Sequence, residues 1–123
     1  MASPARYDWT VWTRSDDSTT FTFLDGTDRV DLTGDTITLA LEWAGGTSSI
    51  TLVSGVDSEV VIEDQTVPAT MGQVTIKMSF AQRIQLPLYS GVRYQLERTT
   101  GSDTLIHLYG EVTATNWIDH PDA

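Results

Sequence analysis

The sequence predicts an all-β domain, an antiparallel two-sheet β-sandwich of the immunoglobulin-like type with about seven or eight strands. Nineteen of the 123 residues are threonine, a β-branched residue that suits a half-exposed pleated surface. Residues 36–43 alternate strictly, with Ile37, Leu39 and Leu41 on one face, which is typical of a strand with one buried side. No stretch has a convincing 3.6-residue period, so we expect at most one helical turn within 81–86.

Strands are predicted where alternation of apolar and polar residues is bounded by turn residues. Two aromatic residues, Phe21 and Phe23, share one side of the second strand. The two glycines of 44–47 indicate a hairpin, and the polar segment 99–103 indicates a turn around Gly101. The eight predicted strands span residues 7–13, 19–24, 36–43, 48–53, 59–63, 73–80, 92–98 and 104–114.

Alternation also predicts which side chains of the later strands are buried. In 73–80 the inward residues are Val74, Ile76, Met78 and Phe80. In 104–114 they are Ile106, Leu108, Gly110 and Val112. The second pattern places His107 on the outward face of its strand.

A turn precedes the strand at 92–98. Leu88 stands six residues before Tyr94, with Gly91 between them. This spacing is similar to the tyrosine corner of sandwich domains, in which the tyrosine hydroxyl bonds to an upstream backbone group and fixes a crossover between the sheets. A simple turn before a strand is the alternative.

Length and charge limit the classes of function. The chain is predicted to be a single domain, 1–123, with short flexible termini at 1–6 and 119–123. Its formal net charge is −10, with 17 acidic and seven basic residues, which disfavours binding to nucleic acids or to anionic membranes. No apolar segment has the length of a membrane span or a signal core. The chain has no cysteine, which excludes disulfides and thiolate metal sites.

Catalytic and metal sites are not expected. Asp25, Asp28 and Asp31 lie in a short segment that also contains Gly26. Their spacing does not fit an EF-hand loop, and aspartate and glycine are also the residues that turns favour. Glu42 and Glu111 fall on predicted outward faces, where paired acid–base catalysis is not expected. The chain has no GxSxG motif and only two histidines, His107 and His120. We therefore predict that the protein is not an enzyme, with no catalytic residues, no metal and no cofactor.

The tryptophans are the candidate contact residues. Trp9 and Trp12 have opposite parity, so one of them should face away from the core, whereas Trp43 continues an inward face. Trp117 and Ile118 follow the last predicted strand. Because exposed aromatic residues often mark contact surfaces, Trp9, Trp12, Trp117 and Ile118 are the predicted partner interface. Two alternatives are that Trp117 folds back beside the first strand, or that the tryptophans stack on sugars, as in carbohydrate-binding modules.

Several short motifs resemble those of a phage protein family. They are Val30-Asp31-Leu32-Thr33-Gly34-Asp35-Thr36-Ile37-Thr38-Leu39, Gly72-Gln73-Val74-Thr75-Ile76, Leu88-x-x-Gly91-x-x-Tyr94-x-Leu96 and Leu108-Tyr109-Gly110-Glu111-Val112. Over about residues 20–114, the sequence resembles the N-terminal domain of baseplate upper proteins and related tail or head accessory proteins of tailed bacteriophages. The N-terminal strand lies outside this pattern.

The resemblance implies a non-enzymatic structural protein of the virion, either a tail or baseplate accessory protein or a head decoration protein. Its implied partners are other capsid or tail proteins and further copies of itself in a symmetric oligomer. Such a protein is assembled in the host cytoplasm and acts through protein–protein contacts, with no nucleic acid or membrane as partner.

Overall fold

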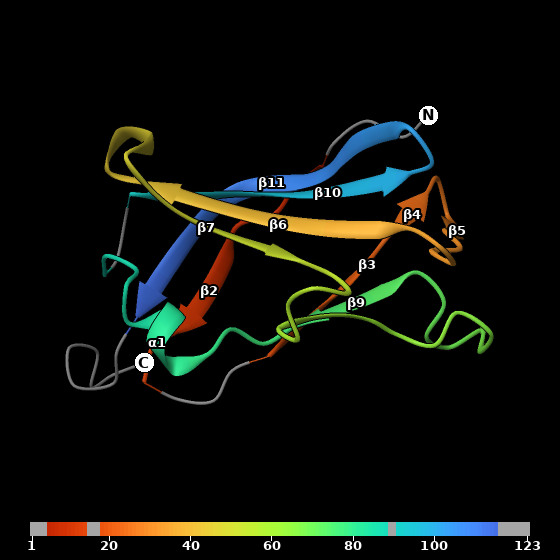
Figure 1. Ribbon diagram of the computed structural model, residues 1–123, viewed down its shortest axis with the longest axis horizontal. Coiled ribbons are helices and arrows are strands. Elements are labelled where there is room, and N and C mark those ends of the chain that lie inside the picture. Colours follow the sequence, from red (N-terminus) through yellow and green to blue (C-terminus); the bar gives the residue numbers. More distant parts are fainter. Residues whose placement is uncertain (1–4, 15–17, 89–90, 116–123) are drawn as a thin grey trace.

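The chain is mostly β-structure, as predicted. The structure is a computed structural model that describes residues 5–14, 18–88 and 91–115 (Figure 1). The strands of this part are β1 (Ala5–Arg6), β2 (Trp9–Trp12), β3 (Thr19–Thr22), β4 (Leu24–Asp25), β5 (Asp28–Arg29), β6 (Thr36–Trp43), β7 (Ser48–Val53), β8 (Val60–Ile62), β9 (Gln73–Ile76), β10 (Val92–Thr100) and β11 (Asp103–Thr115). Its helices are a 3₁₀ turn, η1 (Ala44–Gly46), and the one-turn α1 (Phe80–Arg83).

The large sheet has the order β1-β11-β10-β6-β7, and β2 continues the line of β1 along the same edge of β11 (Figure 1). The pairs within β6, β7, β10 and β11 are antiparallel. In contrast, β1 and β2 run parallel to β11, so the prediction of a wholly antiparallel arrangement is wrong for the N-terminal strands. Alternation reports which face of a strand is buried, but carries no information on the direction of its neighbour. Ala5 and Arg6, part of the predicted flexible terminus, form β1.

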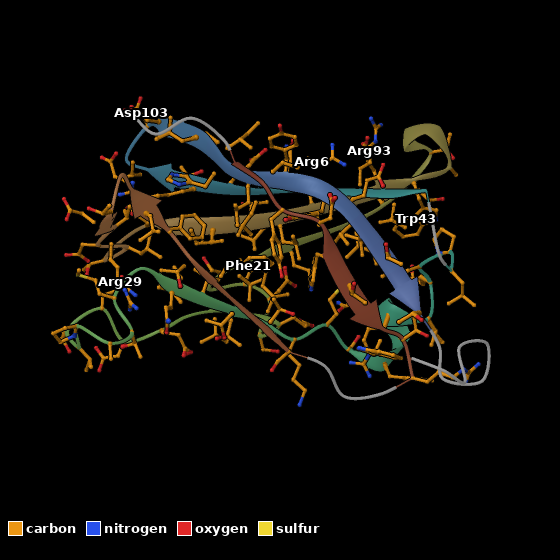
Figure 2. The ribbon with its side chains drawn as sticks, turned by 180° about the vertical axis from the view of Figure 1, so that it is seen from behind. Arg6, Phe21, Arg29, Trp43, Arg93 and Asp103 are labelled. Atoms are coloured by element: carbon orange, nitrogen blue, oxygen red, sulfur yellow. The ribbon has the colours of Figure 1, made fainter. Side chains whose placement is uncertain are left out.

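The remaining strands form a three-stranded sheet, β3-β9-β8, and the small β4-β5 hairpin. Side chains from the large and the three-stranded sheets meet in one hydrophobic core, and Figure 2 shows Phe21 between them. The largest fully buried side chains of this core are Phe23, Leu32, Ile37, Leu39, Leu41, Ile76, Leu96, Val11, Val74, Val92 and Val112.

The β6–β7 hairpin matches its prediction residue for residue. Ile37, Leu39 and Leu41 are buried, and the turn uses positive φ angles at Gly45 (67°) and Gly46 (87°), which glycine adopts without steric cost. The predicted helical turn is also present. It begins one residue early, because the Ser79 side chain accepts a hydrogen bond from the backbone of Gln82 and caps the turn.

That cap explains an error in the predicted core. β9 ends at Ile76, and although Met78 is buried as predicted, Phe80 is half exposed. Strand alternation no longer applies after Ile76, and Phe80 is the first residue of α1. The prediction that Phe80 is buried is therefore wrong.

A β-bulge in β11 reverses the predicted faces at one end of that strand. Leu96 pairs with Leu108 and the next residue, Glu97, pairs with Ile106, so His107 has no partner on β10. An extra residue shifts the alternation by one position. Ile106 is therefore exposed, contrary to the prediction, and His107 is half-buried with its ring centre 4.8 Å from that of Phe23.

The position of His107 predicts an acid-sensitive contribution to stability. Burial, together with the nearby Arg98, lowers the pKa of His107 below its ordinary value of 6.5. The unfolded chain therefore binds this proton more readily, so the histidine destabilises the folded state as the pH falls below about 6.5. We expect His107→Gln to lose less unfolding free energy than the parent chain between pH 7.5 and pH 5.5 in urea titrations. Equal losses of unfolding free energy in the two chains would contradict the lowered pKa of His107.

The predicted corner joins different elements. Gly91 has a φ of 92°, as a turn requires, and Leu88 forms a bridge with Ala114. The Tyr94 hydroxyl donates to the backbone carbonyl of Tyr7, at 2.5 Å. The acceptor is an upstream backbone group, as predicted, but it lies between β1 and β2, so the bond joins the N-terminal segment to β10 and not one sheet to the other.

Candidate functional site

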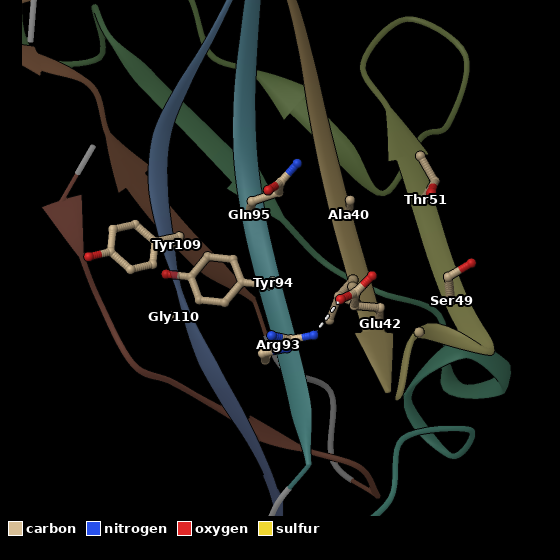
Figure 3. A pocket seen from close by; sticks show the side chains of 11 residues that line it. Ala40, Glu42, Ser49, Thr51, Arg93, Tyr94, Gln95, Tyr109 and Gly110 are labelled. Carbon is tan, nitrogen blue, oxygen red and sulfur yellow. Dashed lines mark hydrogen bonds and ion pairs between the residues drawn. The ribbon is translucent and has the colours of Figure 1, made fainter. Parts of the chain in front are cut away.

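The outer face of the large sheet carries a hollow of about 500 Å³ (Figure 3). Its walls come from β11, β10, β6 and β7, whose outward side chains alternate with the core residues. A hollow forms because Ala40 in β6 has only a methyl group as its outward side chain. The longer polar and aromatic side chains around it are Glu42, Ser49, Thr51, Arg93, Gln95 and Tyr109.

One ion pair lies at the rim of the hollow. Arg93 Nη2 is 2.8 Å from Glu42 Oε1, and their side chains are 69% and 49% exposed. A pair this exposed contributes little to folding, about 0–1 kcal/mol. Arg93 and Glu42 can therefore give up this ion pair and bind charged groups of a partner protein, at small cost to the stability of the fold.

One tyrosine and two arginines lie on this face. Tyr109 is 42% exposed. Arg6 and Arg93, two of the seven basic residues, lie on the outer side of the large sheet (Figure 2). Tyrosine and arginine are enriched at the centres of protein interfaces. The hollow thus combines an aromatic ring, a guanidinium and several uncharged hydrogen-bonding groups, which suits it to binding.

The sequence-based prediction missed these residues. Their parity was available, because Arg93 and Gln95 alternate with buried residues, and Tyr109 has the same parity as the outward Glu111. The alternation does not show which strands lie side by side, because it does not determine the register between distant segments. The hollow between four strands could therefore not be predicted.

The predicted contact tryptophans do not line the hollow. Trp9 is only 4% exposed, and its Nε1 donates to Thr19 Oγ1 at 3.0 Å. Its ring packs edge-on against Phe21 and Tyr94. Trp9 is therefore a core residue, and its assignment to a surface interface is wrong.

The other predicted contact residues have different outcomes. Trp12 lies on the opposite side of β2 and is half-buried, as its parity predicts. Trp43 packs against the core. Trp117 and Ile118 lie outside the described residues, as does His120, so their predicted roles stay predictions.

The aspartate-rich segment forms turns. Asp25 pairs with Asp28 across the β4–β5 hairpin. Asp31 Oδ1 accepts from the Thr33 backbone at 3.0 Å and its hydroxyl at 2.7 Å, and these bonds lower the pKa of Asp31. Within residues 5–14, 18–88 and 91–115, no three acidic or histidine side chains are grouped as metal ligands.

No protein-family model matches the chain, and no curated protein matches its sequence.

The described α-helix is far too short to span a bilayer, and no other helix of the described part is long and apolar enough to do so.

Proposed function

We propose that the protein is a non-enzymatic, immunoglobulin-like β-sandwich that binds other proteins through the outer face of its large sheet, as a structural component of a tailed bacteriophage particle. The observation that carries the binding role is the hollow around Tyr109 and Arg93. This surface places interface-forming side chains around the small side chain of Ala40.

The strand order supports the immunoglobulin-like assignment. The order β11-β10-β6-β7 in one sheet and β3-β9-β8 in the other corresponds to strands G, F, C and C′ facing B, E and D of variable-type domains. The strands β1 and β2 pair with β11, the counterpart of strand G, and take the place of the first strand of the immunoglobulin domain.

The charge of the hollow supports a protein partner. Arg93 is basic on a chain of net charge −10, and its exposed pair with Glu42 offers one group of each sign. An acidic chain that binds through such a mixed face selects a partner by complementary charges and shape. The carbohydrate-binding alternative depended on exposed tryptophans, and the burial of Trp9 removes part of that support.

The phage assignment rests on the motifs that resemble virion proteins. One of them, residues 108–112, supplies both Tyr109 and Gly110 to the hollow. A weak contact is sufficient in a particle, because many copies held in one symmetric shell bind with high avidity. The direct test is mass spectrometry of purified particles of the phage whose genome encodes the chain. Stoichiometric amounts in the particle support the proposal, and absence from it refutes the virion role.

Substitutions in the hollow test the binding face. We expect Tyr109→Ala combined with Arg93→Ala to weaken binding to the particle's capsid or tail proteins at least about tenfold, because truncating aromatic and arginine anchors costs over 1 kcal/mol each. Thr10→Ala, at the exposed position of β2, is the control and should bind normally. Biolayer interferometry measures both. Unchanged binding by the double variant would exclude this face.

A further inference from the structure

The strand β7 has an open edge. It lies at the end of the large sheet, and no strand of the described chain pairs with its outer side (Figure 1). The Ser54 amide donates to the Ile37 carbonyl at 2.9 Å, which identifies these two residues as a hydrogen-bonded pair of the β6–β7 ladder. Because such pairs alternate in antiparallel strands, the backbone groups of Ser49, Thr51 and Val53 point away from β6.

One end of this edge is closed by its own loop. The Val53 amide donates to Asp57 Oδ2 at 2.8 Å, and its carbonyl accepts from the Asp57 amide at 2.8 Å. The backbone groups of Ser49 and Thr51 therefore remain as two donors and two acceptors on the open part of the edge. β7 has none of the usual protections against strand addition, since it contains no proline, lysine or bulge.

We infer that this edge pairs with the same edge of a second copy of the chain. In an antiparallel arrangement with Ser49 opposite Thr51 of the second copy, the two open residues of each copy exchange four backbone hydrogen bonds. The twofold axis then passes between the two Ile50 residues, and every open donor meets an acceptor. The edge is thus self-complementary, as a twofold interface requires.

The pairing strand itself adds no charge repulsion between the two copies. The segment Ser48–Val53 contains no ionisable residue, although each chain carries a net charge of −10. The outward side chains of Ser49 and Thr51 would face each other across the new pair, where hydroxyl groups bond well. A four-residue pairing buries less surface than a standard interface, so the dimer is weak, and salt strengthens it by screening the repulsion between the chains.

The pairing would place two binding faces beside each other. Ser49 and Thr51 also form one wall of the hollow (Figure 3). In the dimer the two large sheets become one continuous sheet, with one hollow on each side of the twofold axis. This inference goes beyond the proposed function, because self-association needs neither a virion partner nor an occupied hollow.

Sedimentation velocity over a range of protein concentrations tests the dimer. We expect a monomer–dimer equilibrium in the parent chain that shifts toward dimer between low salt and about 0.5 M salt. Thr51→Pro removes an outward amide without breaking the β6–β7 ladder, and should raise the dissociation constant at least about tenfold. Thr51→Lys should also weaken the dimer, although it reduces the net negative charge. Thr10→Lys makes the same charge change at the opposite edge of the sheet and should not weaken it.

Cysteine variants test the register, because the chain has no cysteine of its own. Cross-strand neighbours lie within disulfide range. A mixture of Ser49→Cys and Thr51→Cys chains should therefore form covalent dimers faster than either variant alone. If Ser49→Cys or Thr51→Cys alone forms covalent dimers faster than the mixture, Ser49 does not lie opposite Thr51 of the second copy. A parent chain that stays monomeric at high concentration and high salt, with no linkage above a Thr10→Cys control, would overturn the dimer, whether or not the protein is found in particles.

Discussion

Gly110→Ala should lower the free energy of unfolding by about 3 kcal/mol, at the upper end of the range for overpacked sites. A Cβ atom at Gly110 would collide with the Tyr7 carbonyl oxygen and lie 2.9 Å from Asp8 Oδ1. The backbone comes this close because the Tyr7 carbonyl turns to accept the Tyr94 hydroxyl, while Asp8 Oδ1 accepts from the Glu111 amide. An alanine would push the N-terminal segment off β11, and Trp9 fluorescence should shift to the red as its ring becomes exposed. Urea unfolding monitored by fluorescence measures both effects.

A truncated chain tests the cause. Deletion of residues 1–8 removes the atoms that the new methyl group would strike, so Gly110→Ala should cost almost nothing in that background. Gly101→Ala is the matched glycine control. Its Cβ would contact no atom within 4 Å, and its φ of 60° predicts a loss of only about 1–2 kcal/mol. An equally large effect of Gly110→Ala in the truncated chain would show that the close approach to Tyr7 is not the reason.

The most predictable parts of the fold are those in which each local signal agrees. In β6 and β7 the alternation, the glycine turn and the burial of one face indicate the same hairpin, and its bounds follow from the sequence alone. The burial of Phe21 and Phe23 follows in the same way. The β6–β7 hairpin pairs segments that are close in the chain.

The errors occur where a distant segment decides the outcome. His107 lies at a bulge that depends on the register between β10 and β11, and alternation alone cannot locate an extra residue. Tyr94 bonds to a carbonyl 87 residues away, and Trp9 is buried because Phe21 and Tyr94 surround it. The candidate site has the same origin. Arg93 and Tyr109 are predictably outward, but the hollow exists only because neighbouring strands bring them beside Ala40.

Asp35→Ala should cost about 2–3 kcal/mol of unfolding free energy, slightly less than the loss of a partner from a fully buried ion pair. Asp35 Oδ2 is 2.6 Å from Arg98 Nε, and the two side chains are 5% and 18% exposed. Asp35 immediately precedes β6 and Arg98 lies in β10, so the pair joins two strands of the large sheet. Without the carboxylate, the Arg98 guanidinium remains largely desolvated with its main counter-charge gone. Urea unfolding at pH 7 measures the loss.

Two comparisons separate this charge effect from a general loss of contacts. Glu42→Ala removes the carboxylate of the exposed pair with Arg93 and should change stability by less than about 1 kcal/mol. Arg98→Met alone should be destabilising, since it leaves Asp35 buried without its cation, whereas Asp35→Leu with Arg98→Met should recover most of the loss, because two apolar side chains need no counter-charge. If the double replacement is as unstable as the sum of the single ones, the cost lies in packing at the start of β6 and not in the stranded charge.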